Sequence, residues 1–354
     1  MTIFDTAPPK GTVRDWLDSQ AEVGGAAIAY KFTDGTAPLS WCDMRDRARN
    51  MARYLTELGL TKGESLAVMM PNGKPALEAL FASLYGGFRV TMINLAAGND
   101  AIRYALEHSE ARYAFVGKAQ QDQFSETRSN LVAALPDIPS ETRLAQLHSL
   151  DAGDDALLMY TSGTTGRPKG VVHSHSSLLA GGWTTATAHA LTPADCGYCV
   201  LPICHINGLC VSVMGSLISQ SQLLVAPKFS ASRFWSDIDT GAATWFSVVP
   251  TIISHLLHGA KDPNESVKAR LRFGRSASSA LAPDVQTAFE ARFDVPIVET
   301  MGMTETAAQM LSNPLPPGLR KIGSPGLALG NEVAILRQDL SLADSDAFPY
   351  TTLT

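Results

Sequence analysis

The stretch Tyr160–Val171 reads YTSGTTGRPKGV and directly follows a short apolar run, Ala156–Met159, that is expected to be a buried strand. The eleven residues after Tyr160 contain four hydroxyl side chains, three glycines and two cations. Glycine lets the backbone approach a ligand closely and expose its N–H groups, the hydroxyls add donors, and Lys169 adds a point charge. The segment therefore predicts a loop that binds phosphate.

Two other interpretations of this loop are less consistent with its residues. A Walker A loop places Lys directly after Gly and before Ser or Thr, at the start of a helix. Here Pro168 precedes Lys169 and Gly170 follows it. A plain surface turn is the usual outcome for clusters of Ser, Thr and Gly. A turn, however, needs neither this density of donors nor the Pro-Lys-Gly ending.

Strand and helix patterns alternate on both sides of the loop. Ser40 followed by Asp43 is typical of the start of a helix, and Gly59 is typical of its end. Strands that are apolar throughout and are separated by helices favour parallel sheets covered on both faces. The expected strands are 26–32, 65–70, 89–93, 113–116, 155–160, 196–201, 222–226, 244–249, 271–276 and 295–299, and the expected helices are 41–58, 73–86, 98–109, 176–189, 207–219, 230–239, 250–258 and 283–292.

The length of 354 residues suggests about two structural units. We expect a first α/β subdomain over residues 1–175, ending in the phosphate-binding loop, and a second α/β subdomain over residues 176–337. The polar stretch 119–150 is expected to be a connection. Residues 338–354 lack periodicity and are expected to be a tail or the start of a truncated region.

Composition excludes several classes of protein. Hydrophobic residues make up 45% and charged residues 18%, as in an ordinary globular core. A net charge of −6 gives no basic surface for nucleic acid. Five cysteines are too few and odd in number for a disulfide framework, no apolar run reaches the ~18 residues of a membrane span, and no secretory signal is found. We therefore expect a cytoplasmic protein with neither a nucleic-acid partner nor a membrane span.

The loop at 160–171 resembles the signature of the ANL superfamily, which comprises acyl-CoA synthetases, peptide-synthetase adenylation domains and luciferases. It matches the pattern YTSGTTGxPKGV at every fixed position. Five other segments resemble family motifs in the same order, and together they cover about residues 10–337. These segments are Gly59–Asn72, Pro202–Gly208 (PxxHxxG), Ser276–Leu281, Gly302–Glu305 (GxTE) and Ile322–Gly326 (IGxPxxG).

This resemblance implies an α/β fold with two doubly wound, mostly parallel sheets stacked in an αβαβα arrangement around a cleft. It implies an ATP-dependent, AMP-forming acyl-CoA ligase that binds Mg-ATP and a carboxylic acid and forms an acyl-adenylate and pyrophosphate. The acid is expected to be a fatty or aromatic acid of medium or large size. Its carboxylate is already ionised at neutral pH, so the reaction needs positioning and charge neutralisation rather than a general base.

Site residues follow from the resemblance position by position. Lys169 and the loop Thr161–Gly166 are expected to hold the β- and γ-phosphates, and Thr304 is expected to contact the α-phosphate. Glu305, with Thr165, is expected to bind Mg²⁺, which prefers oxygen ligands, and His205 is expected to lie near the acyl group. Lys169, Thr304, Glu305 and His205 form the expected catalytic set. The expected nucleotide-binding residues are Thr161, Ser162, Gly163, Thr164, Thr165, Gly166, Lys169, Ser276, Ala277, Ser278, Ser279, Glu299, Thr300, Met301, Gly302, Met303 and Thr304.

The sequence departs from the family pattern in three places. Met301 stands where an aromatic residue usually stacks on adenine, and Cys204 stands where Phe is common. After Ile335 the family continues to an aspartate that holds the ribose and to a small lid that carries a lysine, and neither is found here. The chain is therefore interpreted as an N-terminal domain without the lid, with transfer to CoA expected only in the complete enzyme.

Several alternatives stay open. The chain could be a nucleotide- or acyl-binding protein without turnover, or an adenylation domain that loads the thiol of a carrier protein, and a homodimer is allowed. Cys196 and Cys199 could bind zinc, but successive side chains of a strand point to opposite faces, which favours two buried thiols. His173 and His175 could bind a metal, but a structural role at the start of a helix is favoured.

Overall fold

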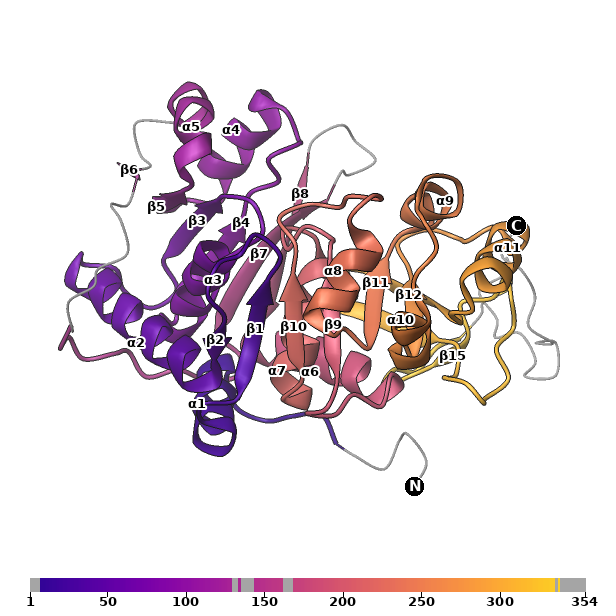
Figure 1. The fold of residues 1–354 in the computed structure, drawn as a ribbon. Helices are drawn as coiled ribbons and strands as arrows, with labels where there is room; N and C mark the ends of the chain where they lie inside the picture. Colours follow the sequence, from indigo (N-terminus) through magenta and orange to yellow (C-terminus); the bar gives the residue numbers. More distant parts are fainter. Residues whose placement is uncertain (1–6, 129–132, 135–142, 162–167, 335–336, 338–354) are drawn as a thin grey trace.

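The computed structural model describes residues 7–128, 133–134, 143–161, 168–334 and 337, and two β-sheets organise them (Figure 1). Within these residues, one sheet has six strands in the order β6-β5-β3-β4-β7-β8, and the other has nine in the order β15-β14-β13-β12-β11-β9-β10-β1-β2. The strands are β1 (Ile28–Phe32), β2 (Leu39–Ser40), β3 (Ser65–Met69), β4 (Arg89–Met92), β5 (Ala111–Val116), β6 (Ala133–Ala134), β7 (Asp155–Thr161), β8 (Lys169–Ser174), β9 (Cys196–Cys199), β10 (Gln222–Val225), β11 (Trp245–Val248), β12 (Phe273–Ser276), β13 (Ile297–Met303), β14 (Ala308–Ser312) and β15 (Leu327–Ala328).

Most neighbouring strands are parallel, which confirms the expected α/β class. Antiparallel pairs occur toward the sheet edges, where β8 pairs with β7, β14 with β13 and β15, and β2 with β1. No antiparallel strand was predicted from the sequence. β8 begins inside the motif at 160–171, which was interpreted as a loop, and β14 and β15 lie in segments to which no strand was assigned.

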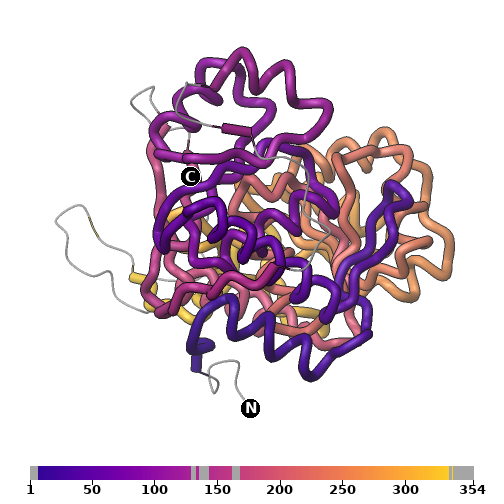
Figure 2. The backbone as a smooth tube through the Cα atoms, turned by 90° about the vertical axis from the view of Figure 1, so that its left-hand side faces the viewer, coloured from indigo at the N-terminus to yellow at the C-terminus, as the bar shows by residue number. Residues whose placement is uncertain are grey.

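Helices cover both faces of both sheets (Figures 1 and 2). Side chains of α4 and α5 pack on the outer face of the six-stranded sheet, and those of α8, α9, α10 and α11 pack on the outer face of the nine-stranded sheet. A central core between the sheets contains side chains of α1, α2, α3, α6 and α7. The helices are α1 (Val13–Gly24), α2 (Trp41–Glu57), α3 (Lys74–Gly86), α4 (Asn99–His108), α5 (Gln121–Thr127), α6 (His175–Ala188), α7 (Gly215–Ser219), α8 (Phe234–Gly241), α9 (Pro250–Gly259), α10 (Glu265–Arg270) and α11 (Pro283–Phe293), with shorter turns η1 (Lys118–Gln120) and η3 (Thr304–Thr306).

Alternating side chains explain why a strand that is apolar throughout needs helices on both faces. In β3, Leu66 and Val68 belong to the central core, whereas Ala67 and Met69 belong to the core beneath α4. Successive side chains of a strand point to opposite faces, so an uninterrupted apolar run is stable only when both are covered. The stacking of helix, sheet, helix, sheet and helix layers agrees with the expected arrangement.

Local signals placed some helix ends correctly and missed others. Ser40 and Asp43 form the expected capping box at the start of α2, and Gly59 adopts a φ of +84° just after that helix ends. Thr12 and Asp15 form a second capping box at the start of α1, which was not predicted. The expected helix at 207–219 is a π-helix, η2 (Asn207–Met214), that continues into α7.

The boundary expected at residue 175 falls between β8 and α6, but the two sheets do not divide the chain at a single residue. β1 and β2 precede the whole six-stranded sheet and nevertheless belong to the nine-stranded one, where Tyr30 pairs with Leu223 of β10. The subdomain boundaries therefore stay a prediction. The expected tail at 338–354 lies outside the described residues.

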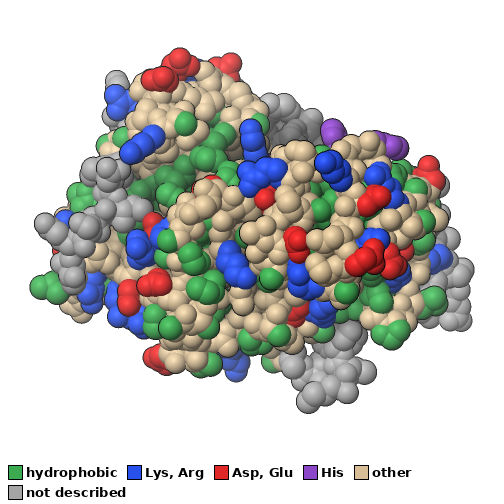
Figure 3. Space-filling view, in the orientation of Figure 1, with side chains coloured by type: hydrophobic (Ala, Val, Ile, Leu, Met, Phe, Trp, Pro, Cys, Tyr) green, Lys and Arg blue, Asp and Glu red, His purple; other side chains and the backbone are tan. Residues whose placement is uncertain are grey.

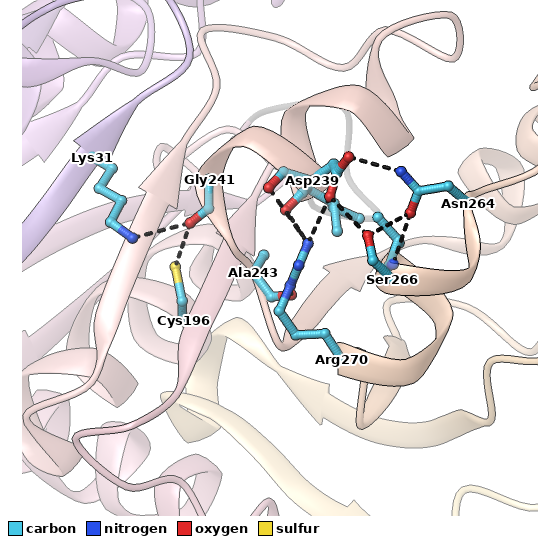
Figure 4. A network of polar contacts seen from close by, with 10 residues as sticks. Lys31, Cys196, Asp239, Gly241, Ala243, Asn264, Ser266 and Arg270 are labelled. Carbon is cyan, nitrogen blue, oxygen red and sulfur yellow. Dashed lines mark hydrogen bonds and ion pairs between the residues drawn. The ribbon is translucent and has the colours of Figure 1, made fainter.

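Arg270 and Asp239 organise a polar network at the end of α8 (Figure 4). Arg270 donates to the carbonyl oxygen of Ile238 at 3.1 Å and to the carboxylate of Asp239 at 3.3 Å. Asn264, which caps the start of α10, donates to the same carboxylate at 2.8 Å. The last carbonyls of a helix have no partner within the helix, so this network stabilises the end of α8 and fixes α10 against it.

His175 links the start of α6 to the start of α1. It is fully buried, and its Nδ1 accepts a hydrogen bond from the backbone N–H of Val13 at 3.4 Å. Burial lowers the pKa of His175 to about 4, so the imidazole is neutral near pH 7. The favoured structural role for this histidine is consistent with these contacts.

We expect His175 to make the protein less stable as the pH falls from about 6.5 toward 4. Over that range the unfolded chain takes up a proton that the folded chain does not, so the free energy of unfolding decreases. His175→Asn keeps an acceptor for Val13 but removes the titration. Urea unfolding at pH 7.5 and 5.0 should show a loss for the native chain that is larger by about 2 kcal/mol than the loss for the variant. His258→Asn, at an exposed position in α9, is the control; equal losses in all three proteins would contradict this account.

Candidate active site

The carboxyl ends of β12 and β13 lie side by side in the nine-stranded sheet. Ser276 pairs with Glu299, and the hydroxyl of Thr300 donates to the carbonyl oxygen of Ser276 at 3.4 Å. Glu299 also accepts a hydrogen bond from the backbone N–H of Leu281 at 3.0 Å, which ties the loop after β12 to β13. The structure thus brings the segments 276–281 and 299–303 together, although they are separate in the sequence.

Glu299 is buried, and burial raises the pKa of its carboxyl. Its Oε1 accepts from Leu281, while its Oε2 has no hydrogen-bond partner among the described residues. A buried acceptor without a partner costs free energy unless a ligand satisfies it. Oε2 is therefore a buried acceptor on β13 that no described residue satisfies.

The expected phosphate-binding loop joins β7 to β8 in the six-stranded sheet. Thr161, the last residue of β7, pairs with Lys169, the first residue of β8, so the two ends of the loop are adjacent. Lys169 is exposed. The expected contacts of Ser162, Gly163, Thr164, Thr165 and Gly166 lie outside the described residues.

A cavity of about 470 Å³ lies between the β7–β8 connection and the turn after β13, and no residue of 276–281 or 299–303 lines it. Thr161 and Pro168 line it from the β7–β8 connection, Cys204 and His205 from the segment before the π-helix, and Thr304 from the turn after β13. The rest of the lining is mostly apolar and comes from Tyr160 of β7, from β4, from α4 and from the connection between β4 and α4. Side chains from four separate segments of the sequence therefore surround one hollow large enough for a small molecule.

Of the expected catalytic residues, His205 and Thr304 line this cavity, while Lys169 and Glu305 each follow a lining residue directly. Glu305 is exposed in η3. His205 is exposed to the solvent, but its partial desolvation lowers its pKa below the ordinary value, so its imidazole is neutral near pH 7. His205 can therefore donate or accept a hydrogen bond but adds no positive charge. Burial raises the pKa of the neighbouring Cys204 thiol to about 12, so this residue is also uncharged.

On the face shown in Figure 3, hydrophobic side chains gather in the hollow beneath α4 and α5. A second cavity of about 180 Å³ is lined by Met92, Ile93, Asn94 and Cys204, which also line the larger one. The connection after β4 therefore borders both cavities.

No helix among the described residues is both long enough and apolar enough to cross a membrane.

The geometry disfavours zinc at the cysteine pair. Cys196 belongs to the outer core and Cys199 to the central core, so their side chains point to opposite faces of β9. The thiol of Cys196 contacts the carbonyl oxygen of Gly241 at 3.7 Å (Figure 4). His173 contacts the hydroxyl of Ser177 at 3.1 Å. In the part of the chain that the structure describes, no three His, Cys, Asp or Glu side chains are grouped as a metal site would require.

Comparison with known proteins identifies the family. A family model described as "AMP-binding enzyme" matches residues 17–344. The chain belongs to the AMP-binding enzyme family. Sulfoacetate–CoA ligase of Cupriavidus necator is 39% identical over 305 residues, which are 82% of this chain and 59% of that protein. Oxalate–CoA ligase of Arabidopsis thaliana is 31% identical over 315 residues, which are 84% of this chain and 61% of that protein.

A solved structure of ATP-bound MatB from Rhodopseudomonas palustris has a TM-score of 0.80 and 26% identity, and the alignment covers 91% of this chain and 65% of that one. These comparisons confirm both the expected family and the α/β fold. The chain spans about three fifths of the length of the two curated relatives.

One buried residue beside the site was missed in the sequence analysis. Arg275 precedes Ser276 on β12 and is 2% exposed. Two arginines, Arg272 and Arg275, lie within the strand expected at 271–276, and they were the available signal because arginine is almost never fully buried unless it is paired.

Gly302 of the GxTE motif allows β14 to fold back closely on β13. The register shifts between Met301 and Gly302, and a Cβ at residue 302 would overlap the backbone carbonyl of Ala308. A β-bulge of this kind redirects the side chains that follow it. Glycine at this position therefore permits the turn that presents Thr304 and Glu305.

We expect Gly302→Ala to lower the free energy of unfolding by about 2 kcal/mol, because β13 and β14 must separate to admit the methyl group. The same variant should lose affinity for ATP. Gly153→Ala is the matched control, since a Cβ there meets nothing within 4 Å. Urea unfolding and calorimetry check both effects; equal unfolding midpoints for the two variants would contradict the steric role of Gly302.

Proposed function

We propose that this chain is the nucleotide- and acid-binding part of an AMP-forming acid–CoA ligase. The observation that carries the proposal is the cavity that Thr161, His205 and Thr304 line together, with Lys169 and Glu305 adjacent to it. The phosphate chain of ATP suits the hydroxyl, ammonium and carboxylate groups at this cavity. The acyl group suits the apolar part of the lining and the imidazole. Family membership supports the same chemistry.

The reaction requires few proton transfers. A carboxylate oxygen of the acid attacks the α-phosphorus of ATP, the bond between this phosphorus and the bridging oxygen breaks, and pyrophosphate leaves with the electron pair. Lys169 and the hydroxyls of the β7–β8 loop stabilise the charge on the leaving group, and Thr304 donates to the α-phosphate. Neutral His205 positions the acid without competing for its carboxylate.

The exposed carboxylate of Glu305, one residue after Thr304, is a suitable oxygen ligand for Mg²⁺. When bound, this ion neutralises charge on the phosphates. CoA is the proposed thiol acceptor because both curated relatives are named as CoA ligases. Both relatives are longer than the region that matches this chain, and we propose that the acylation of CoA requires a ligase of that full length.

The names of the relatives also favour an acid class. Sulfoacetate carries a sulfonate beside its carboxylate, and oxalate carries two carboxylates. We propose a small acid with a second acidic group, in place of the larger fatty or aromatic acid expected from the sequence.

Acid-dependent release of pyrophosphate from Mg-ATP by the 354-residue chain tests the proposed function. Lys169→Ala should reduce release and the affinity for ATP at least tenfold, since it removes a charge aimed at the phosphates, and it should leave the melting temperature unchanged because Lys169 is exposed. Lys228→Ala, also exposed, is the control. Calorimetry supplies the affinity even without turnover. Equal behaviour of the two variants would refute the loop assignment, and ATP binding without release under any acid would favour a binding protein.

Glu305→Gln should weaken the dependence of ATP binding on Mg²⁺ without changing the fold. Thermal unfolding with ATP, in the presence and absence of Mg²⁺, measures this coupling. We expect the native chain to gain stability from adding Mg²⁺ to ATP, and the variant to gain little. Glu22→Gln on α1 is the control. An unchanged gain in the Glu305 variant would exclude this residue as the metal ligand.

A further inference from the structure

Arg275 is a buried cation that only neutral groups surround. Its Nη1 donates to the amide oxygen of Asn207 at 2.8 Å and to the hydroxyl of Ser247 at 3.1 Å, and its Nε donates to the amide oxygen of Gln309 at 3.2 Å. Its Nη2 donates to no group among the described residues. The guanidinium is therefore held firmly in place with one donor group left over.

Nearby arginines are compensated differently. Arg270 pairs with Asp239 at 3.3 Å and Arg272 pairs with Asp195 at 2.6 Å. No carboxylate among the described residues forms such a pair with Arg275. The nearby imidazole of His189 is buried, and burial keeps its pKa well below the ordinary value, so it carries no charge. Burial also lowers the pKa of Arg275 to about 9, so it is a cation at neutral pH.

A charge buried without a counter-ion is costly, and removing the charge or supplying a partner relieves that cost. The neighbouring Arg270 and Arg272 have carboxylate partners, and Arg275 does not. A ligand with negative charge would compensate Arg275, and a guanidinium suits a planar carboxylate or a sulfonate because its donors form a fork.

The position of Arg275 connects it to the candidate site. It directly precedes Ser276, at the carboxyl end of β12. Asn207, which holds its Nη1, also donates to the hydroxyl of Ser278 at 3.2 Å and lies two residues after His205, which lines the cavity. Asn207 thus links the guanidinium both to the 276–280 loop and to the segment that carries His205.

We propose that Arg275 is the specificity-determining residue that recognises a second anionic group on the acid, while the first carboxylate is activated at the phosphates. This inference rests on the proposed function and adds the group that selects the substrate class. Asn207, Ser247 and Gln309 are positioning residues, since they hold the guanidinium without neutralising it.

Acyl-sulfamoyl adenosines, which mimic the adenylate without reacting, test this proposal at equilibrium with the full chain. The malonyl mimic is compared with the isovaleryl mimic, in which two methyl groups replace the two oxygens of the distal carboxylate. The sulfoacetyl mimic is compared with the 3,3-dimethylbutanoyl mimic in the same way. The native chain should bind at least one anionic mimic tenfold or more tightly than its neutral counterpart, and the preferred pair separates carboxylate from sulfonate.

Three variants separate recognition from structure. Arg275→Met should abolish the preference and retain affinity for the neutral mimics, whereas Arg272→Met, which loses an arginine already paired within the protein, should keep the preference. Gln309→Glu places a carboxylate against the guanidinium, and should abolish the preference while keeping or raising the melting temperature. This third variant remains informative if Arg275→Met fails to fold.

The outcomes are distinct. Tight binding of the neutral mimics with no preference for charge in the native chain would overturn the role of Arg275 and leave the proposed function standing. An equal loss of affinity for anionic and neutral mimics in both Arg275→Met and Gln309→Glu would show that Arg275 is structural. Failure of every mimic and of Mg-ATP to bind the native chain would refute the proposed function itself.

Discussion

Apolar burial in the helical layer between the two sheets holds the candidate site together. The cavity takes Thr161 from the six-stranded sheet and Thr304 from the strand end of the nine-stranded sheet, and these two elements share no strand pairing. Their relative position is set by the central core, to which helices α2, α3 and α6 contribute from between the sheets. Because packed interiors are close to crystalline density, this layer acts as a rigid spacer.

Several polar side chains on or next to β12 and β13 are buried without a full set of partners. Arg275 lacks a counter-ion, Glu299 has a buried oxygen without a partner, and His189 is fully buried without charge. Elsewhere, Arg270 and Arg272 are paired with carboxylates. Arg275 and Glu299 lie on β12 and β13, the strands that carry the segments 276–281 and 299–303. Perturbed polar groups of this kind are typical of a surface that a ligand completes.

Short-range sequence patterns predicted most of the parallel strands and several helix ends. Apolar runs located most parallel strands, and the Ser40–Asp43 box located the start of α2 because both residues act within one helical turn. It did not predict the π-helix at 207–214, since the hydrophobic pattern there fits either helix type. The resemblance identified the motifs of the site, and family membership is confirmed, but the roles of individual residues stay predictions. Arg275 was not identified from the sequence because its burial and its hydrogen bonds depend on three residues from other elements, Asn207, Ser247 and Gln309.

The membership of β1 in the nine-stranded sheet has a consequence for synthesis. Tyr30 finds its partner Leu223 only after most of the chain has left the ribosome. Until then β1 and its hairpin partner β2 present an open strand edge, and such edges pair readily with other chains. Pairing between distant segments is also slow, because loop closure must precede the contacts that stabilise it. Strand β1 thus keeps an unpaired edge until β10 has been synthesised, and it needs protection from other chains during that interval.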